Sequence, residues 1–275
     1  MENVHVLDKW FKLDKLPTTL CAGCGNGIVF QSLARALEKT GVDQNDVIVV
    51  TGVGCSSRAN IFMDVTGPQT THGRPIAFAT GMKMTNPRLK VIVVAGDGDA
   101  TSIGGNHFIQ ACRRNIDMTI IVCNNSNYGM TGGQYSATTP TDSYTKTSVY
   151  GHIEPNFDVC ALAQGAGATY VARSTTYHVN GLVNQIAAAL DHKGLSVVEA
   201  MCDCVTLFGR LNKRGTPADM ILRWKDVCVP VERAKAMTQE ELAGKLVIGK
   251  LYENNTIPEY TEQYAKLIER ARGNE

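Results

Sequence analysis

Two segments of the sequence carry the residue types that bind a phosphate and a cation together. Gly96-Asp97-Gly98-Asp99 directly follows the apolar run 91–95, and Asn124-Asn125-Ser126-Asn127 follows the run 118–123. Glycines at a strand-to-helix turn let the backbone approach a phosphate, but neighbouring aspartates would repel it. A divalent cation between them removes the conflict, because Mg²⁺ binds one or two carboxylates together with a diphosphate. The pattern therefore predicts a Mg²⁺–diphosphate site, which the glycine-rich loop 128–134 would extend.

Nine cysteines form a second group of candidate ligands. The number is odd and the chain is not small, which argues against a disulfide framework. Cys21 and Cys24 form a C-x-x-C, Cys55 lies among glycines and serines after the run 46–51, and Cys202 and Cys204 follow the run 195–200. Thiol redox chemistry, zinc and iron–sulfur binding all remain open for this set. The other four lie in apolar helix, strand or tail contexts and are expected to be structural residues: Cys112, Cys123, Cys160 and Cys228.

Strand-like and helix-like segments alternate along most of the chain. Short β-branched runs at 46–51, 90–95, 118–123, 168–172 and 195–200 predict strands that are buried on both faces. Amphipathic or alanine-rich segments around 30–37, 103–113 and 180–190 predict helices between them. The expected fold is α/β, a mostly parallel sheet with helices on both faces, with ligands at the carboxyl ends of its strands.

The alternation stops after about residue 212. We expect residues 1–212 to form the ligand-binding domain, and 213–275 to form a C-terminal extension that packs on this domain or on a partner subunit. The extension reads as mostly polar, with short helical pieces such as 260–272.

Charge and hydropathy exclude several classes of protein. The 275 residues include 27 Lys and Arg against 26 Asp and Glu, a net charge of +1, which gives no electrostatic case for nucleic acid or an anionic membrane. The longest apolar runs fall far short of the ~20 residues that span a bilayer. The first 13 residues alternate charged and apolar side chains, unlike a signal peptide. We expect a cytoplasmic protein.

The motifs resemble those of a known enzyme family. Gly-Asp-Gly followed by Asn-Asn after the next strand is similar to the signature of thiamine-diphosphate enzymes. The longer pattern, through Tyr-Gly-Met-Thr-Gly-Gly-Gln at 128–134, resembles the β subunits of 2-oxoacid:ferredoxin oxidoreductases, most of all the 2-oxoglutarate type. The resemblance covers about residues 20–212 and implies the thiamine-diphosphate-binding fold.

The resemblance also assigns roles residue by residue. The implied Mg²⁺ ligands are Asp97, Asn125 and the backbone carbonyl of Asn127. The implied neighbours of thiamine diphosphate are Gly54, Cys55, Ser56, His72, Thr80, Gly98, Asp99, Gly129 and Met130. The implied ligands of one [4Fe–4S] cluster are Cys21, Cys24, Cys55 and Cys204.

Two of the implied roles need further comment. The family's late cysteine usually follows a proline, and Asp203 stands there in this chain, so Cys202 remains an alternative to Cys204. Arg58 would face a substrate carboxylate, to which a guanidinium can bind through two hydrogen bonds.

The reaction that the resemblance implies is oxidative decarboxylation of a 2-oxoacid with coenzyme A, giving acyl-CoA, CO₂ and reduced ferredoxin. The sequence holds no second α/β domain, so a partner α subunit is expected to supply the pyrimidine-binding domain, in a heterodimer or a dimer of heterodimers. For the substrate, 2-oxoglutarate is favoured, with pyruvate or a broad range of 2-oxoacids as the alternative. A non-redox thiamine-dependent synthase or decarboxylase and a zinc-binding module without activity also stay open.

Overall fold

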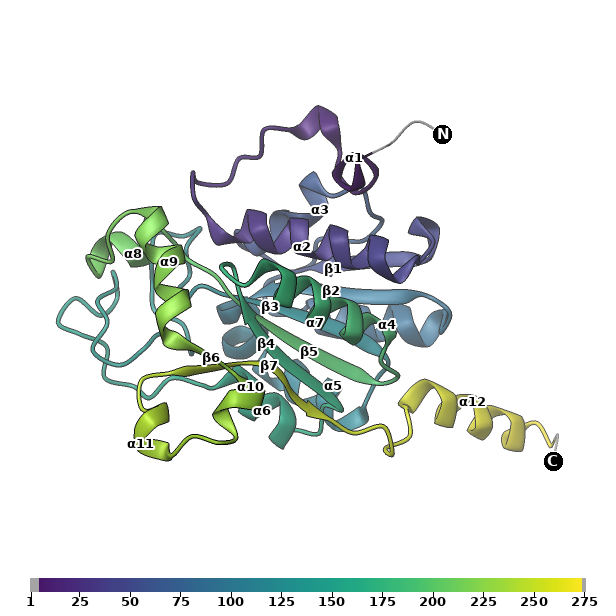
Figure 1. The fold of residues 1–275 in the computed structure, drawn as a ribbon. Helices are drawn as coiled ribbons and strands as arrows, with labels where there is room; N and C mark the ends of the chain where they lie inside the picture. The colour runs from purple at the N-terminus through teal and green to yellow at the C-terminus, as the bar shows by residue number, and fades with distance from the viewer. Residues whose placement is uncertain (1–4, 274–275) are drawn as a thin grey trace.

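A seven-stranded sheet forms the centre of the computed structural model, which describes residues 5–273 (Figure 1). Its strand order is β1-β2-β3-β5-β4-β7-β6. Five strands are parallel: β1 (Val47–Thr51), β2 (Lys90–Gly96), β3 (Met118–Asn124), β5 (Leu195–Met201) and β4 (Tyr170–Thr175). These are the five strands that the sequence predicts, and the mostly parallel α/β fold is confirmed.

Helices cover both faces of the sheet. On one face lie α2 (Gly25–Thr40) and α7 (Val179–Asp191), and on the other α4 (Pro75–Thr85), α5 (Gly105–Arg114) and α6 (Val159–Gly165). Of these five, α2, α5 and α7 were expected from the sequence, whereas α4 and α6 were not. The shorter helical elements are α1 (Val6–Trp10), η1 (Leu13–Lys15), η2 (Gln44–Asp46), η3 (Ser56–Arg58), α3 (Ala59–Phe62), η4 (Gly98–Ile103), α8 (Phe208–Leu211), α10 (Val231–Ala234) and α11 (Gln239–Leu242).

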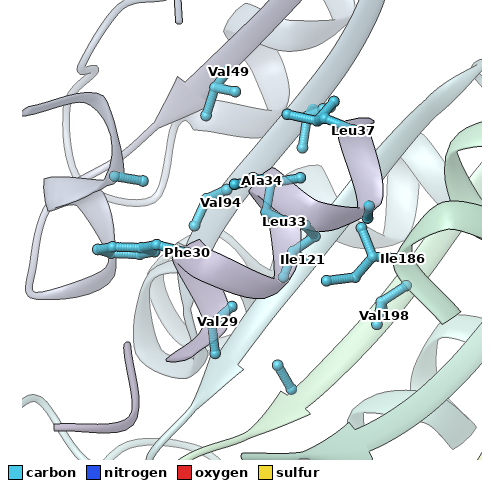
Figure 2. Packing of buried hydrophobic residues seen from close by; sticks show 14 of the residues in the cluster. Val29, Phe30, Leu33, Ala34, Leu37, Val49, Val94, Ile121, Ile186 and Val198 are labelled. Carbon is cyan, nitrogen blue, oxygen red and sulfur yellow. The ribbon is translucent and has the colours of Figure 1, made fainter. Parts of the chain in front are cut away.

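The two-residue period of the strands divides the core between the faces. Val94, Ile121 and Val198 point toward α2 and α7, where they meet Leu33 and Leu37 and are fully buried (Figure 2). Their strand neighbours point to the opposite face and contact α4, α5 and α6. Every central strand therefore buries both of its faces, which explains why these strands read as continuous apolar runs rather than as alternating ones.

The C-terminal extension adds two strands that the sequence reading missed. β7 (Leu246–Glu253) pairs antiparallel with β4, and β6 (Cys228–Pro230) pairs parallel with β7. β7 is only half-buried and carries charged residues, and β6 pairs with only its first three residues, so β7 lacks the apolar pattern of the central strands. Helix α9 (Pro217–Val227) packs near the loop after β5, whereas α12 (Tyr260–Ala271) projects beyond the sheet (Figure 1).

Residues 125–158, all of which the structure describes, form neither a helix nor a strand. This segment connects β3 to α6 and carries the glycine-rich loop at the carboxyl end of the sheet. Among the described residues, no helix has the length and apolar character needed to span a bilayer.

Candidate functional site

A cavity opens where strands β1, β2 and β3 end. Three loops line it: 53–56 after β1, 96–99 after β2 and 125–131 after β3, with His72 beside them. Eleven residues predicted to bind a cofactor or Mg²⁺ line this one cavity: Gly54, Cys55, Ser56, His72, Asp97, Gly98, Asp99, Asn125, Asn127, Gly129 and Met130. The parallel topology brings these residues together, because the carboxyl ends of its strands share one edge.

The turn after β2 is unusually tight. Asp97 begins the turn, and residues 98–103 form the π-helix η4 before α5 begins. A side chain at Gly98 would place its Cβ 2.4 Å from the Tyr128 ring, so glycine is required where the two loops approach each other.

Asp97 is buried at the base of this turn. Its Oδ2 accepts hydrogen bonds from the hydroxyls of Ser136 and Thr138, the latter at 2.8 Å. Its Oδ1 accepts a weak hydrogen bond from the backbone N–H of Asn125 at 3.3 Å. Burial raises the pKa of Asp97, and these hydrogen bonds oppose the rise. A cation beside Oδ1 would supply the missing compensation for a buried carboxylate.

The distances around the Asn125 side chain indicate whether such a cation would fit. Its amide oxygen lies 2.8 Å from the Asn127 carbonyl oxygen, 3.1 Å from Asn127 Oδ1 and 3.2 Å from Asp97 Oδ1. These are contacts between acceptors, which repel one another unless the amide is rotated or a cation lies between the oxygens. Octahedral Mg²⁺ with bonds of about 2.05 Å holds neighbouring oxygens about 2.9 Å apart. In this orientation of the Asn125 amide, its oxygen lies 2.8 to 3.2 Å from oxygens of Asp97 and Asn127, close to the spacing of neighbouring magnesium ligands.

His72 and Asp99 form a pair on the opposite wall. His72 Nδ1 and the Gly73 amide each lie 2.6 Å from Asp99 Oδ1. Asp99 Oδ2 is buried without a hydrogen-bond partner, and it lies where a Cβ at Gly52 would be, 2.0 Å away. Asp99 is thereby turned toward His72, while the ring of His72 packs edge-on against Tyr128. Asp99 therefore lines the cavity mainly as the residue that orients His72.

Four cysteines converge beside the cavity. A Cβ built on Gly129 would lie 3.5 Å from Cys204 Sγ and 3.7 Å from Cys55 Sγ. Burial, together with the neighbouring thiols of Cys24, Cys204 and Cys21, raises the pKa of Cys55 to about 11. Within the described part of the chain, no three sulfurs lie within 4.8 Å of one another. One tetrahedral zinc requires sulfurs about 3.8 Å apart, so the spacing favours a larger group such as an iron–sulfur cluster.

The structure separates Cys204 from Cys202. Cys202 is buried in the hydrophobic core, where its Cβ lies 2.6 Å from the Cβ position of Gly25. Cys204 is half-buried, next to Cys55 and Gly129. Because Cys202 points into the core, it is Cys204 that lies with Cys55 beside the cavity. Of the four cysteines expected to be structural, Cys112, Cys123 and Cys160 are buried and Cys228 is half-buried.

With this geometry established, comparisons with known proteins decide the family. Residues 30–200 match the family model described as thiamine pyrophosphate enzyme, C-terminal TPP binding domain. The chain is 46% identical over 269 residues to the 2-oxoglutarate synthase subunit KorB of Methanocaldococcus jannaschii, covering 98% of this chain and 99% of that one. This chain belongs to the 2-oxoacid:ferredoxin oxidoreductases. Within them it is a β subunit of the 2-oxoglutarate type.

Two further relatives agree with this family membership. The 2-oxoacid:ferredoxin oxidoreductase subunit beta of a Sulfolobus species is 37% identical over 257 residues, covering 88% of this chain and 84% of that one. The solved 2-oxoglutarate:ferredoxin oxidoreductase of Magnetococcus marinus superposes with a TM-score of 0.86 at 31% identity, covering 98% of this chain and 92% of that one. The thiamine-enzyme fold and the oxidoreductase class expected from the sequence are thus confirmed.

Two predicted residues of this oxidoreductase subunit lie outside the cavity. Thr80 is on α4, where its hydroxyl donates to the Ile76 carbonyl at 2.9 Å, and it lines a separate surface hollow with His107 and Arg114. In this chain it does not neighbour the cavity. Arg58, at the end of η3, donates to the carbonyl of Thr19 at 3.3 Å and to its hydroxyl. Its charge lowers the pKa of Cys55, so it faces the cysteine side of the site.

Sequence reasoning missed two residues of the site, Ser136 and Thr138, whose hydroxyls bind Asp97. They follow the glycine-rich loop in the run Gln-Tyr-Ser-Ala-Thr-Thr. Hydroxyl residues after such a loop are common in any turn, so this signal is weak without the fold.

Proposed function

We propose that the chain is the β subunit of a CoA-dependent 2-oxoglutarate:ferredoxin oxidoreductase. The enzyme would convert 2-oxoglutarate and coenzyme A to succinyl-CoA and CO₂ and pass two electrons to ferredoxin through one [4Fe–4S] cluster. The observation that carries the proposal is the position of Cys55, which lines the cavity and also lies beside Cys204 across Gly129. One loop therefore touches both proposed cofactor sites, which gives electrons a short path between them.

The Mg²⁺–diphosphate end of thiamine diphosphate is assigned to the oxygens that converge after β2 and β3. Asp97, Asn125 and the Asn127 carbonyl would hold Mg²⁺, and the backbone around Gly98 and Gly129 would approach the diphosphate. Ser136 and Thr138 fix the Asp97 carboxylate from behind. Asp99 orients His72 toward the cavity, where the imidazole would contact the bound cofactor.

The cluster is assigned to Cys21, Cys24, Cys55 and Cys204. When bound, thiamine diphosphate supplies the electron sink for decarboxylation and the cluster accepts electrons one at a time. The chain holds these groups next to each other and keeps the cysteines partly shielded, since Cys24, Cys55 and Cys204 are half-buried and only Cys21 among the four is exposed.

The substrate assignment rests on the relatives. The Magnetococcus marinus enzyme is described with 2-oxoglutarate, coenzyme A and succinyl-CoA bound, and we extend that substrate set to this chain. Arg58 is the residue we assign to a substrate carboxylate. The pyrimidine-binding domain is assigned to an α subunit, because the described residues contain one α/β sheet.

Anaerobic purification tests the assignment of the cofactors. We expect brown protein, bleached by dithionite, with about four irons and four sulfides per chain. Colourless protein with thiamine diphosphate and Mg²⁺ would support a non-redox thiamine enzyme instead, and zinc alone would support a binding module.

A turnover assay tests the assignment of the partner. The chain co-purified with its α subunit should reduce ferredoxin with 2-oxoglutarate and CoA, whereas the chain alone should not reduce even a dye acceptor. Full activity of the isolated chain would contradict the two-subunit proposal.

A further inference from the structure

Two buried asparagine side chains donate N–H groups to the cysteine sulfurs. Asn26 Nδ2 lies 3.5 Å from Cys24 Sγ, and Asn127 Nδ2 lies 3.7 Å from Cys204 Sγ. Both side chains are at least 95% buried. Burial of an amide costs free energy unless it is used, so the role of these two groups requires an explanation.

Asn26 is directed at the sulfur by the first turn of α2. Cys24 is the residue before this helix, and Asn26 is the second residue of its first turn. Asn26 Oδ1 is buried and has no hydrogen-bond partner. Holding an unsatisfied carbonyl inside the protein is unfavourable, and the only described polar contact of this side chain is with sulfur.

Asn127 reaches both proposed cofactor sites. Its backbone carbonyl is one of the oxygens clustered around Asn125, and its side-chain Oδ1 lies 3.1 Å from the Asn125 amide. Its Oδ1 end thus faces Asn125, and its Nδ2 end faces Cys204. One residue thus joins the oxygen-rich side of the site to the cysteine side.

We propose that Asn26 and Asn127 set the reduction potential of the cluster held by the four cysteines. This inference rests on the proposed function, which assigns the cysteines as cluster ligands. The oxidised cluster gains one electron on reduction, and the added negative charge spreads onto its sulfurs. N–H groups that donate to those sulfurs stabilise the reduced form more than the oxidised form, and so raise the potential.

Redox titration of the anaerobically purified holoenzyme tests this proposal. Asn26→Leu and Asn127→Leu keep the side-chain size and remove the donor, and neither removes the Asn127 backbone carbonyl. Asn60→Leu is the matched control, because Asn60 Nδ2 donates to the carbonyls of Gly67 and Pro68 rather than to sulfur. The potential is followed by the EPR signal of the reduced cluster against dithionite and mediator dyes.

Each of the two variants should show a more negative midpoint potential than the wild type. We expect up to a tenfold lower ratio of reduced to oxidised cluster at a fixed potential, which corresponds to about 59 mV for one electron. The double variant should shift further, and Asn60→Leu should not shift. Unchanged potentials in both variants with full iron content would overturn the proposal.

A second measurement needs no variant, in case a substitution prevents cluster assembly. Pulsed EPR on reduced wild-type holoenzyme labelled with ¹⁵N in the asparagine side chains should show ¹⁵N couplings to the cluster. Absence of such couplings would overturn the proposal. Wild-type protein without iron would instead overturn the proposed function itself, so the two failures are distinguishable.

Discussion

The indole N–H of Trp224 donates to Asp203 Oδ2 at 2.8 Å. Trp224 lies on α9 in the C-terminal extension, and Asp203 directly precedes Cys204. Arg223 stacks over the same indole at 4.1 Å and lies 3.7 Å from the other Asp203 oxygen. The extension therefore holds the loop of Cys204, proposed above as the fourth cluster ligand, from outside the parallel sheet.

Trp224→Phe should loosen this loop. Burial raises the pKa of Asp203 and the Trp224 hydrogen bond lowers it, so the variant leaves a buried carboxylate with one donor fewer. We expect a loss of about 1–3 kcal/mol in the free energy of unfolding and faster iron loss in air. Trp10→Phe is the control, since the Trp10 indole donates to the more exposed Glu38 and not to a residue of the cysteine loop. Equal iron retention in both variants would contradict a role for Trp224 at the cysteine loop.

Asp97→Asn should abolish the stabilisation by the cofactor without lowering the stability of the cofactor-free protein. The variant loses the carboxylate assigned to Mg²⁺, so the rise in melting temperature on adding thiamine diphosphate and Mg²⁺ should disappear. Without cofactor, the variant should be as stable as the wild type or more so at neutral pH, because it no longer buries a charge.

The pH dependence of that comparison follows from the raised pKa of Asp97. The native wild type binds more protons than the unfolded chain between the ordinary and the raised value, so its stability increases as the pH falls through the raised pKa. The advantage of Asp97→Asn should therefore shrink at acidic pH, as urea unfolding at several pH values would reveal. An advantage that grows on acidification would contradict the assignment of this buried charge.

Gly52→Ala should disturb the cavity indirectly, through the Asp99 side chain. The new Cβ would lie 2.0 Å from the Asp99 carboxylate, which must then move away from His72. We expect at least a tenfold weaker binding of thiamine diphosphate, measured by calorimetry. In the control Gly165→Ala, the Cβ meets no atom within 4 Å near the end of α6, so its cofactor affinity should equal that of the wild type.

Glu199→Gln should be strongly destabilising. Glu199 is buried between β3 and β4, where it accepts from Arg173 Nε at 2.6 Å and from Asn124 Nδ2 at 2.7 Å. The variant leaves the buried guanidinium with only the partly exposed Asp158 as a partner, at a cost of about 3–5 kcal/mol in denaturant unfolding. A loss below 1 kcal/mol in the free energy of unfolding would contradict this expectation and would show that water solvates the guanidinium in the variant.

Arg58→Ala should raise the KM for 2-oxoglutarate more than the KM for pyruvate, if Arg58 binds the distal carboxylate. Arg58→Lys keeps the charge but loses the planar guanidinium, so it should recover part of the effect. Steady-state kinetics of the complex with both substrates measures this difference. Equal increases in KM for the two substrates would contradict the binding of the distal carboxylate by Arg58.

The central sheet could be predicted from the sequence because the pattern of a strand buried on both faces is visible in a few consecutive residues. Strands buried on both faces must be short, apolar and β-branched, and each of the five parallel strands has that pattern. Strand β7 was missed because a strand half-exposed to water tolerates residues such as Lys250 and Glu253, which leave no such pattern. Its pairing with β4 depends on residues about 80 positions away.

The residue types of the site could also be recognised in the sequence. Gly-Asp-Gly, Asn-Asn and the spaced cysteines carry their chemistry in their side chains, and the rule that parallel strands end at one edge places them together. Most of the predicted cofactor and Mg²⁺ residues do line one cavity, while Thr80 lies outside it.

What the sequence alone determined was therefore the fold class, the family resemblance and the donor types. Only the tertiary structure decided which donors face one another. Cys204 rather than Cys202 lies beside Cys55, Asp99 turns to His72, and Asn26 and Asn127 direct their amides at sulfur. The physical reason is that side-chain direction depends on packing between segments remote in sequence, and spacing along the chain contains no such information.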